Sequence, residues 1–204
     1  MGCSEDHAHL SSQVLVSADV RGVDSHGVAR LSGYIRLWEA NRINAKPNIR
    51  VVYETPSTAV VDGAAGLGLV VAPFAMQVAI DKATKAGTGW VSVKNSNHFG
   101  IAGYHAMMAL KHNMIGMAMT NASALVAPTF SVERMLGTNP IAVAIPADKE
   151  PPFVADFATT TASNGKLEIL QRKNAAAPEE RLLIYSTNVF WFWFAGFGFG
   201  RFQP

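Results

Sequence analysis

The chain has 204 residues, of which 49% are hydrophobic and 16% charged, so it can bury a sizeable core and does not belong to the disordered class. Its 17 basic and 15 acidic residues are interspersed and give a formal net charge of +2, which leaves no electrostatic argument for a nucleic-acid partner. The single cysteine, Cys3, excludes an internal disulfide, and no Cys/His cluster has the spacing of zinc ligands.

Two helices are predicted in a helical N-terminal segment, residues 1–47. The polar start MGCSEDHAHL is unlike a secretory leader, so we expect a cytoplasmic protein. Ser4 precedes two acidic residues and is a typical N-cap for a helix to about Val20. A second helix is predicted from Ser25 to about Asn41. Its apolar stripe, at helical spacing, consists of Val28, Leu31, Ile35 and Trp38.

Residues 48–179 alternate strand patterns with helix patterns. The predicted strands are Arg50–Glu54, Ser57–Val61, Trp90–Val93, Ile115–Thr120, Ile141–Ile145 and Phe153–Phe157. The predicted helices are Pro73–Ala86, with Pro73 in its first turn, and Gly100–His112. This alternation predicts an α/β fold in which a layered α/β domain with a mixed sheet follows the helical segment.

Residues 180–204 form a divergent, aromatic-rich tail. Their apolar run, 189–199, is shorter than the ~20 residues that a membrane-spanning helix needs. The run also lacks the Lys/Arg-rich polar face of helices that lie on membranes. We expect a segment that packs poorly and stands apart from the α/β pattern.

No standard dinucleotide-binding motif is present. The stretch Gly66-Leu67-Gly68 has the first two glycines of the G-x-G-x-x-G fingerprint, but the third is missing. A dinucleotide that binds this chain would therefore not bind through a Rossmann fold.

The stretch DSHGVAR, residues 24–30, has two interpretations. With Ser25 as N-cap, His26 lies in the first helical turn and Arg30 follows on the same face, an arrangement suited to a carboxylate or phosphate. The alternative is a solvated helix start with an ordinary surface arginine. Spacing alone leaves both open.

His98 lies where a predicted strand passes into a helix, which is the sheet edge at which ligands collect in α/β folds. His98, His105 and His112 recur every seven residues, but seven helical residues rise ~10.5 Å, too far for ligands of one zinc ion. We therefore predict no metal site and read His105 and His112 as residues on the flank of a helix. For His98, a ligand-site role and a helix-capping or core role both remain open.

Two further segments carry polar groups at predicted turns. GTNP, residues 137–140, is a turn, and DFATT, residues 156–160, ends a strand with a carboxylate and hydroxyls. Both can be ordinary turn chemistry, although a carboxylate at a strand end is also a common partner of a ribose or a histidine.

Four motifs in order, DVRGVDSHGVARL, NSNHFGIAGYHA, GTNPIAVAIPA and DFATTTASNGK, resemble the malate/L-lactate dehydrogenase family of the non-Rossmann type. That family includes ureidoglycolate, sulfolactate and diketogulonate oxidoreductases. The resemblance runs from about Ser4 to Pro178. It implies hydride transfer between NAD or NADP and a small 2-hydroxy or 2-oxo acid, in a homodimeric enzyme.

The resemblance also implies roles for individual residues. His98 matches the family's proton donor and acceptor, and Ser25, His26 and Arg30 match the substrate-binding motif. Cofactor contacts match Asn121, Ala122, Asp156, Phe157 and Ala158; at Ala122 a hydroxyl that some members carry is absent.

The chain departs from the family pattern at both ends. It starts inside the pattern and leaves it near residue 180, so we expect a truncated form with little activity. The alternative to an oxidoreductase is a non-catalytic variant that acts only through association with a full-length homologue.

Overall fold

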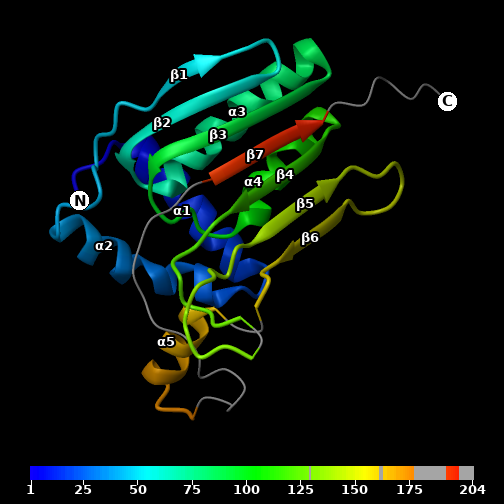
Figure 1. Ribbon diagram of the computed structural model, residues 1–204. Helices are drawn as coiled ribbons and strands as arrows, with labels where there is room; N and C mark the ends of the chain where they lie inside the picture. Colours follow the sequence, from blue (N-terminus) through cyan, green and yellow to red (C-terminus); the bar gives the residue numbers. More distant parts are fainter. Residues whose placement is uncertain (129, 161–162, 177–191, 198–204) are drawn as a thin grey trace.

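A mixed sheet of seven strands forms the centre of the fold, in the order β1-β2-β3-β7-β4-β5-β6 (Figure 1). The computed structural model describes residues 1–128, 130–160, 163–176 and 192–197. The strands are β1 Arg50–Glu54, β2 Thr58–Gly66, β3 Thr88–Ser96, β4 Ile115–Thr120, β5 Ile141–Ile145, β6 Phe153–Phe157 and β7 Phe192–Phe197. Only β2 and β3 run parallel, and the other neighbouring pairs are antiparallel. The predicted α/β class with a mixed sheet is confirmed.

Two helices, α3 (Gly68–Ala86) and α4 (Ala102–Met108), cover one face of the sheet (Figure 1). A 3-10 turn, Ala109–His112, extends α4. The main core lies between these helices and the strands, with Val61, Met76, Ile80, Val91 and Val93 among its buried members. Burial of this apolar surface is the main stabilising contribution to the fold.

The prediction for α3 was wrong at its start. Pro73 lies six residues into the helix instead of in its first turn, and the helix begins five residues earlier, at Gly68. The helix ends as predicted at Gly87, which takes the left-handed conformation that glycine adopts without a steric penalty.

The N-terminal helices are α1 (Glu5–Val20) and α2 (Leu31–Glu39), joined by two 3-10 turns, η1 (Asp24–His26) and η2 (Val28–Arg30). The Ser4 hydroxyl accepts a hydrogen bond from the backbone N–H of His7 at 3.3 Å, as expected of an N-cap. The predicted stripe faces outward on α2, since Leu31 is 44% exposed, and Tyr34 is the buried residue of that helix. A second apolar cluster joins α1, α2 and the first turn of α3.

The prediction that the 180–204 tail stands apart from the α/β pattern was wrong for residues 192–197, which form strand β7 of the sheet. Its backbone pairs with β3 and with β4, over six residues on each side, and so joins the two halves of the sheet. The remaining residues of the 180–204 tail lie outside the described residues.

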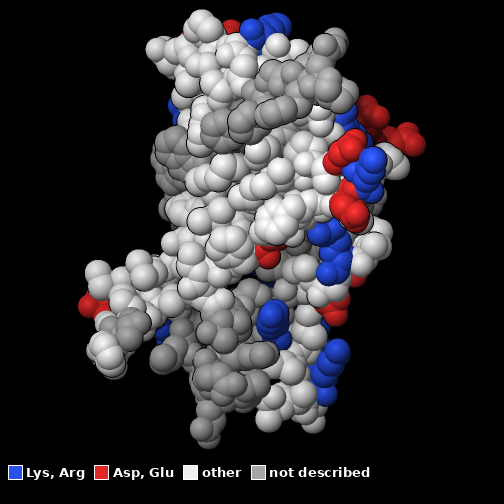
Figure 2. Space-filling view, turned by 90° about the vertical axis from the view of Figure 1, so that its right-hand side faces the viewer, with Lys and Arg blue, Asp and Glu red and all other residues white. Residues whose placement is uncertain are grey.

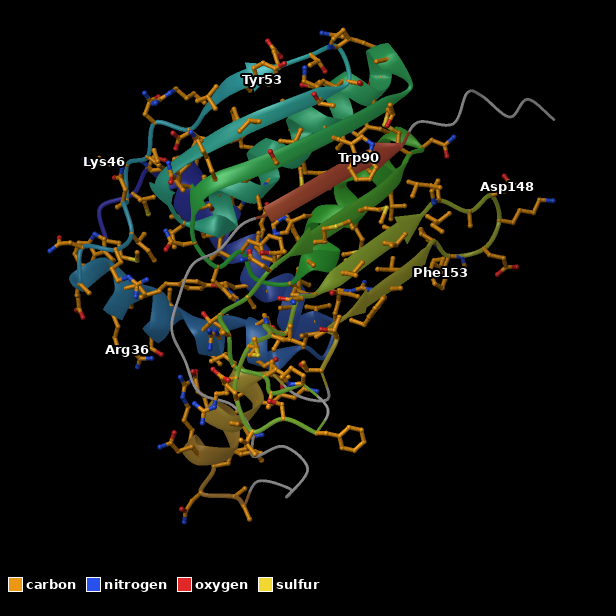
Figure 3. All side chains as sticks on the ribbon, viewed as in Figure 1. Arg36, Lys46, Tyr53, Trp90, Asp148 and Phe153 are labelled. Carbon is orange, nitrogen blue, oxygen red and sulfur yellow. The ribbon has the colours of Figure 1, made fainter. Side chains whose placement is uncertain are left out.

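The edges of the sheet carry exposed aromatic side chains, and charged side chains of both signs lie along one margin of the molecule. Tyr53 on β1 and Phe153 on β6 lie at opposite edges of the sheet (Figure 3), and they are 64% and 60% exposed. On the face shown in Figure 2, basic and acidic side chains gather together along one margin. No helix among the described residues is long and apolar enough to cross a membrane.

Candidate functional site

His98 lies in the short loop between β3 and α4, just after the C-terminal end of β3, which pairs in parallel with β2. Its Nδ1 is 2.7 Å from the hydroxyl of Tyr34, which is 3% exposed. The backbone N–H of Gly100 donates to the same nitrogen at 3.3 Å. Because an N–H can only donate, Nδ1 is the accepting nitrogen, and the proton of the neutral ring is on Nε2. The contact with Tyr34 joins residues 64 positions apart.

His26 stacks on His98, with ring centroids 5.3 Å apart and an interplanar angle of 25°. The Ser25 hydroxyl lies 2.9 Å from Nδ1 of His26 and holds this ring in place. Burial, and to a smaller extent the nearby charges of Arg30 and Lys166, lower the pKa of His26 to about 4. Burial, and then the charges of His26 and Arg30, also hold the pKa of His98 well below 6.5. Two neutral imidazoles therefore lie side by side at pH 7.

The prediction that Ser25 caps an α-helix was wrong. Ser25 lies inside η1, the N–H of His26 is bonded to the Val23 carbonyl, and α2 begins only at Leu31. The cause is Asp19 of α1, whose carboxylate accepts the Val28 N–H at 2.9 Å and fills the space beside Gly27. The N–H groups of His26, Gly27, Val28 and Arg30 are thus paired within the chain and are not presented to an anion as the predicted helix N-terminus would present them.

Arg30 forms an ion pair with Glu168 of α5 (Asn164–Arg172), with Nη1 and Oε2 3.0 Å apart. The two side chains are 24% and 31% exposed. The predicted substrate-binding arginine is therefore close to His26 but is held by a carboxylate of this chain.

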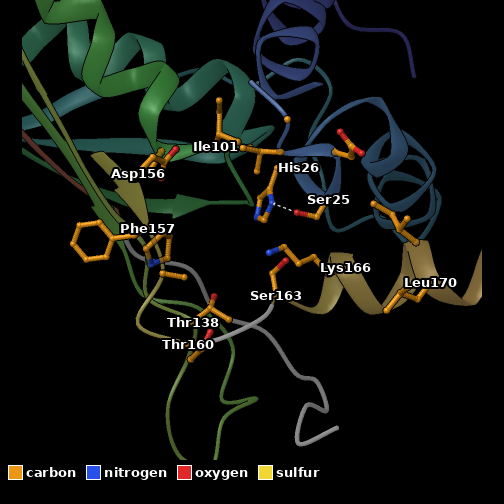
Figure 4. A pocket seen from close by; sticks show the side chains of 18 residues that line it. Ser25, His26, Ile101, Thr138, Asp156, Phe157, Thr160, Ser163, Lys166 and Leu170 are labelled. Atoms are coloured by element: carbon orange, nitrogen blue, oxygen red, sulfur yellow. Dashed lines mark hydrogen bonds between the residues drawn. The ribbon is translucent and has the colours of Figure 1, made fainter. Parts of the chain in front are cut away.

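A cavity of about 570 Å³ lies between the N-terminal turns, the start of α4, the end of β6 and α5 (Figure 4). Of the predicted site residues, it is lined by Ser25, His26, Asp156, Phe157 and Ala158. His98 and Arg30 are not among the lining residues: His98 is stacked against His26, and Arg30 is paired with α5. The volume suits a small organic ligand.

Asp156 has a structural partner in addition to its place in the cavity wall. Its Oδ2 accepts the backbone N–H of Gly103, in the first turn of α4, at 2.7 Å. Burial raises the pKa of this carboxyl, while the Gly103 hydrogen bond lowers it. The strand-end carboxylate of β6 thus fixes the start of the helix that follows His98.

Asn121 and Ala122, the other predicted cofactor contacts, lie in the loop after β4 and do not line the cavity. The N–H of Ala122 donates to Oδ1 of Asn139 at 2.9 Å, so this loop is joined to the turn at 137–140. Thr138 and Pro140 of that turn do line the cavity.

Three further residues of the site were not identified from the sequence: Tyr34, Ser163 and Lys166. Ser163 and Lys166 line the cavity, and both lie within the quoted motif DFATTTASNGK, which was a usable signal. Tyr34 gave no signal, since it lies outside the predicted stripe and its partner is distant in sequence.

His105 is wholly buried, and its Nε2 lies 2.8 Å from the carbonyl oxygen of Phe99, the residue after His98. Within the described part of the chain, no three His, Cys, Asp or Glu side chains are grouped to hold a metal ion.

Known proteins resemble this chain over most of its length. The family model described as malate/L-lactate dehydrogenase matches residues 1–184. A malate dehydrogenase of Pyrococcus abyssi is 50% identical over 179 residues, which cover 88% of this chain and 49% of that protein. An L-sulfolactate dehydrogenase of Methanocaldococcus jannaschii is 44% identical over 178 residues, covering 87% of this chain and 52% of that protein. The chain therefore spans about half the length of these curated relatives.

Solved structures show the same fold. The malate dehydrogenase structure from Pyrococcus horikoshii OT3 has a TM-score of 0.83 at 36% identity, covering 96% of this chain and 70% of that chain. The sulfolactate dehydrogenase structure from Methanocaldococcus jannaschii has a TM-score of 0.85 at 32% identity, covering 97% and 72%.

Proposed function

Because this chain belongs to the malate/L-lactate dehydrogenase family, we propose that its cavity serves hydride transfer between a nicotinamide cofactor and a small 2-hydroxy or 2-oxo acid. The observation that carries the proposal is the pair of stacked neutral histidines, His26 and His98, one of which lines the cavity. A dehydrogenase needs a base for the hydroxyl proton, and a neutral imidazole is such a base.

His98 is the proposed proton donor and acceptor. The Tyr34 hydroxyl donates to Nδ1 when the ring proton is on Nε2. In the other neutral tautomer it accepts from Nδ1–H, and Nε2 is then the nitrogen that takes the substrate proton and gives it back. Burial raises the pKa of Tyr34, which keeps this hydroxyl protonated. Tyr34 thus positions His98 throughout the reaction and does not exchange its own proton.

Ser25, His26 and Arg30 are the proposed substrate-binding residues. Ser25 orients His26, which presents its imidazole to the cavity beside the reacting group. Arg30 supplies positive charge next to His26, and a guanidinium binds a carboxylate through paired hydrogen bonds. Substrate binding would compete with Glu168 for that guanidinium.

The residues present fit the nicotinamide end of NAD or NADP. The wall formed by Asp156, Phe157 and Ala158 combines a carboxylate, an aromatic ring and backbone groups, and the cavity volume suits the ring together with a small acid. The nicotinamide ring, when bound, accepts or supplies the hydride. Asn121 and Ala122 would contact the cofactor outside this cavity.

The choice between NAD and NADP, assembly as a homodimer and a cytoplasmic location complete the proposal. These three parts of the proposal follow from the family to which the chain belongs, and not from contacts between the described residues.

The test is turnover by the purified 204-residue chain. NADH and NADPH binding is first titrated, and cofactor oxidation is then followed with oxaloacetate and with pyruvate. We expect slow but measurable oxidation with at least one pair, as anticipated from the sequence, and a loss of about 10²- to 10⁴-fold in kcat for His98→Asn with cofactor binding retained. His112→Asn is the matched control, because this exposed histidine lies beyond α4, away from the cavity. Absence of turnover in the unmodified chain, or full turnover by His98→Asn, would contradict the proposal.

A further inference from the structure

Helix α5 is fixed against the N-terminal turns at several points. Arg172 donates to the Ala29 carbonyl at 3.1 Å and to the Ser32 hydroxyl at 3.3 Å, and Glu168 pairs with Arg30. At the start of the helix, Gly165 packs so closely on Ser25 that a Cβ would lie 2.6 Å from the Ser25 carbonyl oxygen. These contacts hold the first turn of α5 at the cavity wall.

This arrangement brings the Lys166 ammonium to the cavity. Lys166 extends toward the same space as His26 and Ser163 (Figure 4), and its charge is one cause of the lowered pKa of His26. No ion pair of Lys166 is found within the described ranges, whereas Glu168 of the same helix is paired. The cavity carboxylates are Asp24 and Asp156, and Asp156 is bonded to the Gly103 N–H.

Ser163 marks the same place independently. It occupies the N-cap position of α5, but its side chain makes no capping hydrogen bond to that helix. Its Oγ is buried and has no hydrogen-bond partner among the described residues, although Ser163 lines the cavity. A buried hydroxyl without a partner is costly, and a hydroxyl at the positive end of a nine-residue helix is suited to bind an anion.

We propose that Lys166 and Ser163 form a subsite for the second acidic group of a dianionic 2-hydroxy or 2-oxo acid, whose other carboxylate binds near Arg30. The inference rests on the proposed function and specifies its substrate class: acids with a carboxylate or sulfonate on the carbon next to the reacting one. A cofactor phosphate would share this anion chemistry. The place of Lys166 beside His26, where the reacting carbon is expected, favours the substrate.

The test compares dianionic with monoanionic acids on the full chain. Binding of malate and lactate, measured by calorimetry with NADH or NADPH present, accompanies kcat/KM for oxaloacetate and pyruvate. For Lys166→Gln we expect at least a tenfold larger loss for the dianions than for the monoanions, and for Ser163→Ala a smaller loss of the same selectivity. Lys166→Arg should retain most of the preference. Lys173→Gln is the matched control, because it removes the same charge just beyond α5 and away from the cavity.

Three results would overturn the subsite. The first is an equal loss of binding and kcat/KM for both classes of acid in Lys166→Gln. The second is weaker cofactor binding in that variant without a change in selectivity, and the third is no binding of either acid by the unmodified chain. Failure of the proposed function is recognised separately, because a chain that binds malate in preference to lactate but transfers no hydride retains the subsite and loses the catalytic assignment.

Discussion

The hydroxyl of Tyr34 lies 2.7 Å from Nδ1 of His98, and through this contact helix α2 holds the ring that follows β3. Tyr34→Phe removes the hydrogen bond while keeping the buried ring. We expect kcat to fall about 10- to 100-fold with little change in KM, because the imidazole loses its orientation and its support for the charged state. Unfolding free energy should fall by about 1 kcal/mol.

Steady-state kinetics and urea unfolding measure the two effects. Tyr53→Phe on β1 is the control, because that tyrosine is exposed at the sheet edge (Figure 3). A Tyr34→Phe enzyme with unchanged kcat would show that Tyr34 only fills space.

The lowered pKa of His98 predicts opposite pH dependences for the two reaction directions. Oxidation of a hydroxy acid needs the neutral ring, so its rate should stay high down to below pH 6.5 and decline only as the ring is protonated. Reduction of an oxo acid needs the charged ring, so its rate should rise as the pH falls toward that pKa. Profiles of kcat/KM in both directions test this, and an acid limb of oxidation above pH 7 would contradict it.

His105 predicts that stability depends on pH. Its side chain is wholly buried, and burial lowers its pKa from 6.5 to about 4. Between these values the unfolded chain binds more protons than the folded chain, so the free energy of unfolding should fall as the pH decreases from 6.5 toward 4. At ~1.4 kcal/mol per pKa unit, the contribution of His105 is on the order of 3 kcal/mol.

Urea unfolding between pH 4.5 and 7.5 measures this dependence. His105→Gln should flatten it but not abolish it, because the pKa of His26 is also lowered. His112→Gln, at an exposed position, should leave the slope unchanged. An unchanged slope in His105→Gln would contradict the assignment.

Asp156 should stabilise the start of α4. Asp156→Ala removes the acceptor of the Gly103 N–H and should cost about 1 kcal/mol of unfolding free energy. Asp156→Asn keeps a carbonyl acceptor and should cost less. Asp148, in the turn between β5 and β6 (Figure 3), is exposed, so Asp148→Ala serves as the control in the same denaturation assay. Equal stability of the Asp156→Ala and Asp148→Ala chains would exclude a capping role.

Local patterns predicted the strands best, because β1, β4, β5 and β6 have boundaries set by nearby turn residues and alternation. The error at Ser25 arose where a residue of another helix decided the outcome. At Gly27, the space that a side chain would need is filled by Asp19 of another helix, and this contact replaced the expected helix start with two 3-10 turns. The pairing of β7 with β3 and β4 is likewise a long-range property that no local period reveals.

At the candidate site, too, local motifs were predictable from the sequence and long-range contacts were not. Motifs identified His26 and His98 as candidates, but neither their stacking nor the contact of His98 with Tyr34 follows from spacing. The ion pair of Arg30 with Glu168 joins residues 138 positions apart. Whether a guanidinium is available to a ligand depends on such contacts, and these require the folded chain.

Close packing accounts for the glycine at position 68, although residues 66–68 do not form a dinucleotide fingerprint. A Cβ at Gly68 would overlap the carbonyl groups of Asn97 and His98, so the first turn of α3 packs directly on the backbone that carries His98. Gly68→Ala should therefore destabilise the fold by about 1–3 kcal/mol and displace His98. Gly33→Ala, in α2, is the matched control, because the atom nearest to its new Cβ would be 3.9 Å away and alanine favours a helix by roughly 0.5–1 kcal/mol.

Denaturation of both variants gives the stability difference, and hydride-transfer rates report on the displacement. Since the atoms nearest to a Cβ at Gly68 belong to the backbone of Asn97 and His98, Gly68→Ala should lower kcat more than it changes KM. If Gly68→Ala behaved like Gly33→Ala in both measurements, the close approach of α3 to His98 would not be needed for function, and the glycine would have no role beyond permitting a turn.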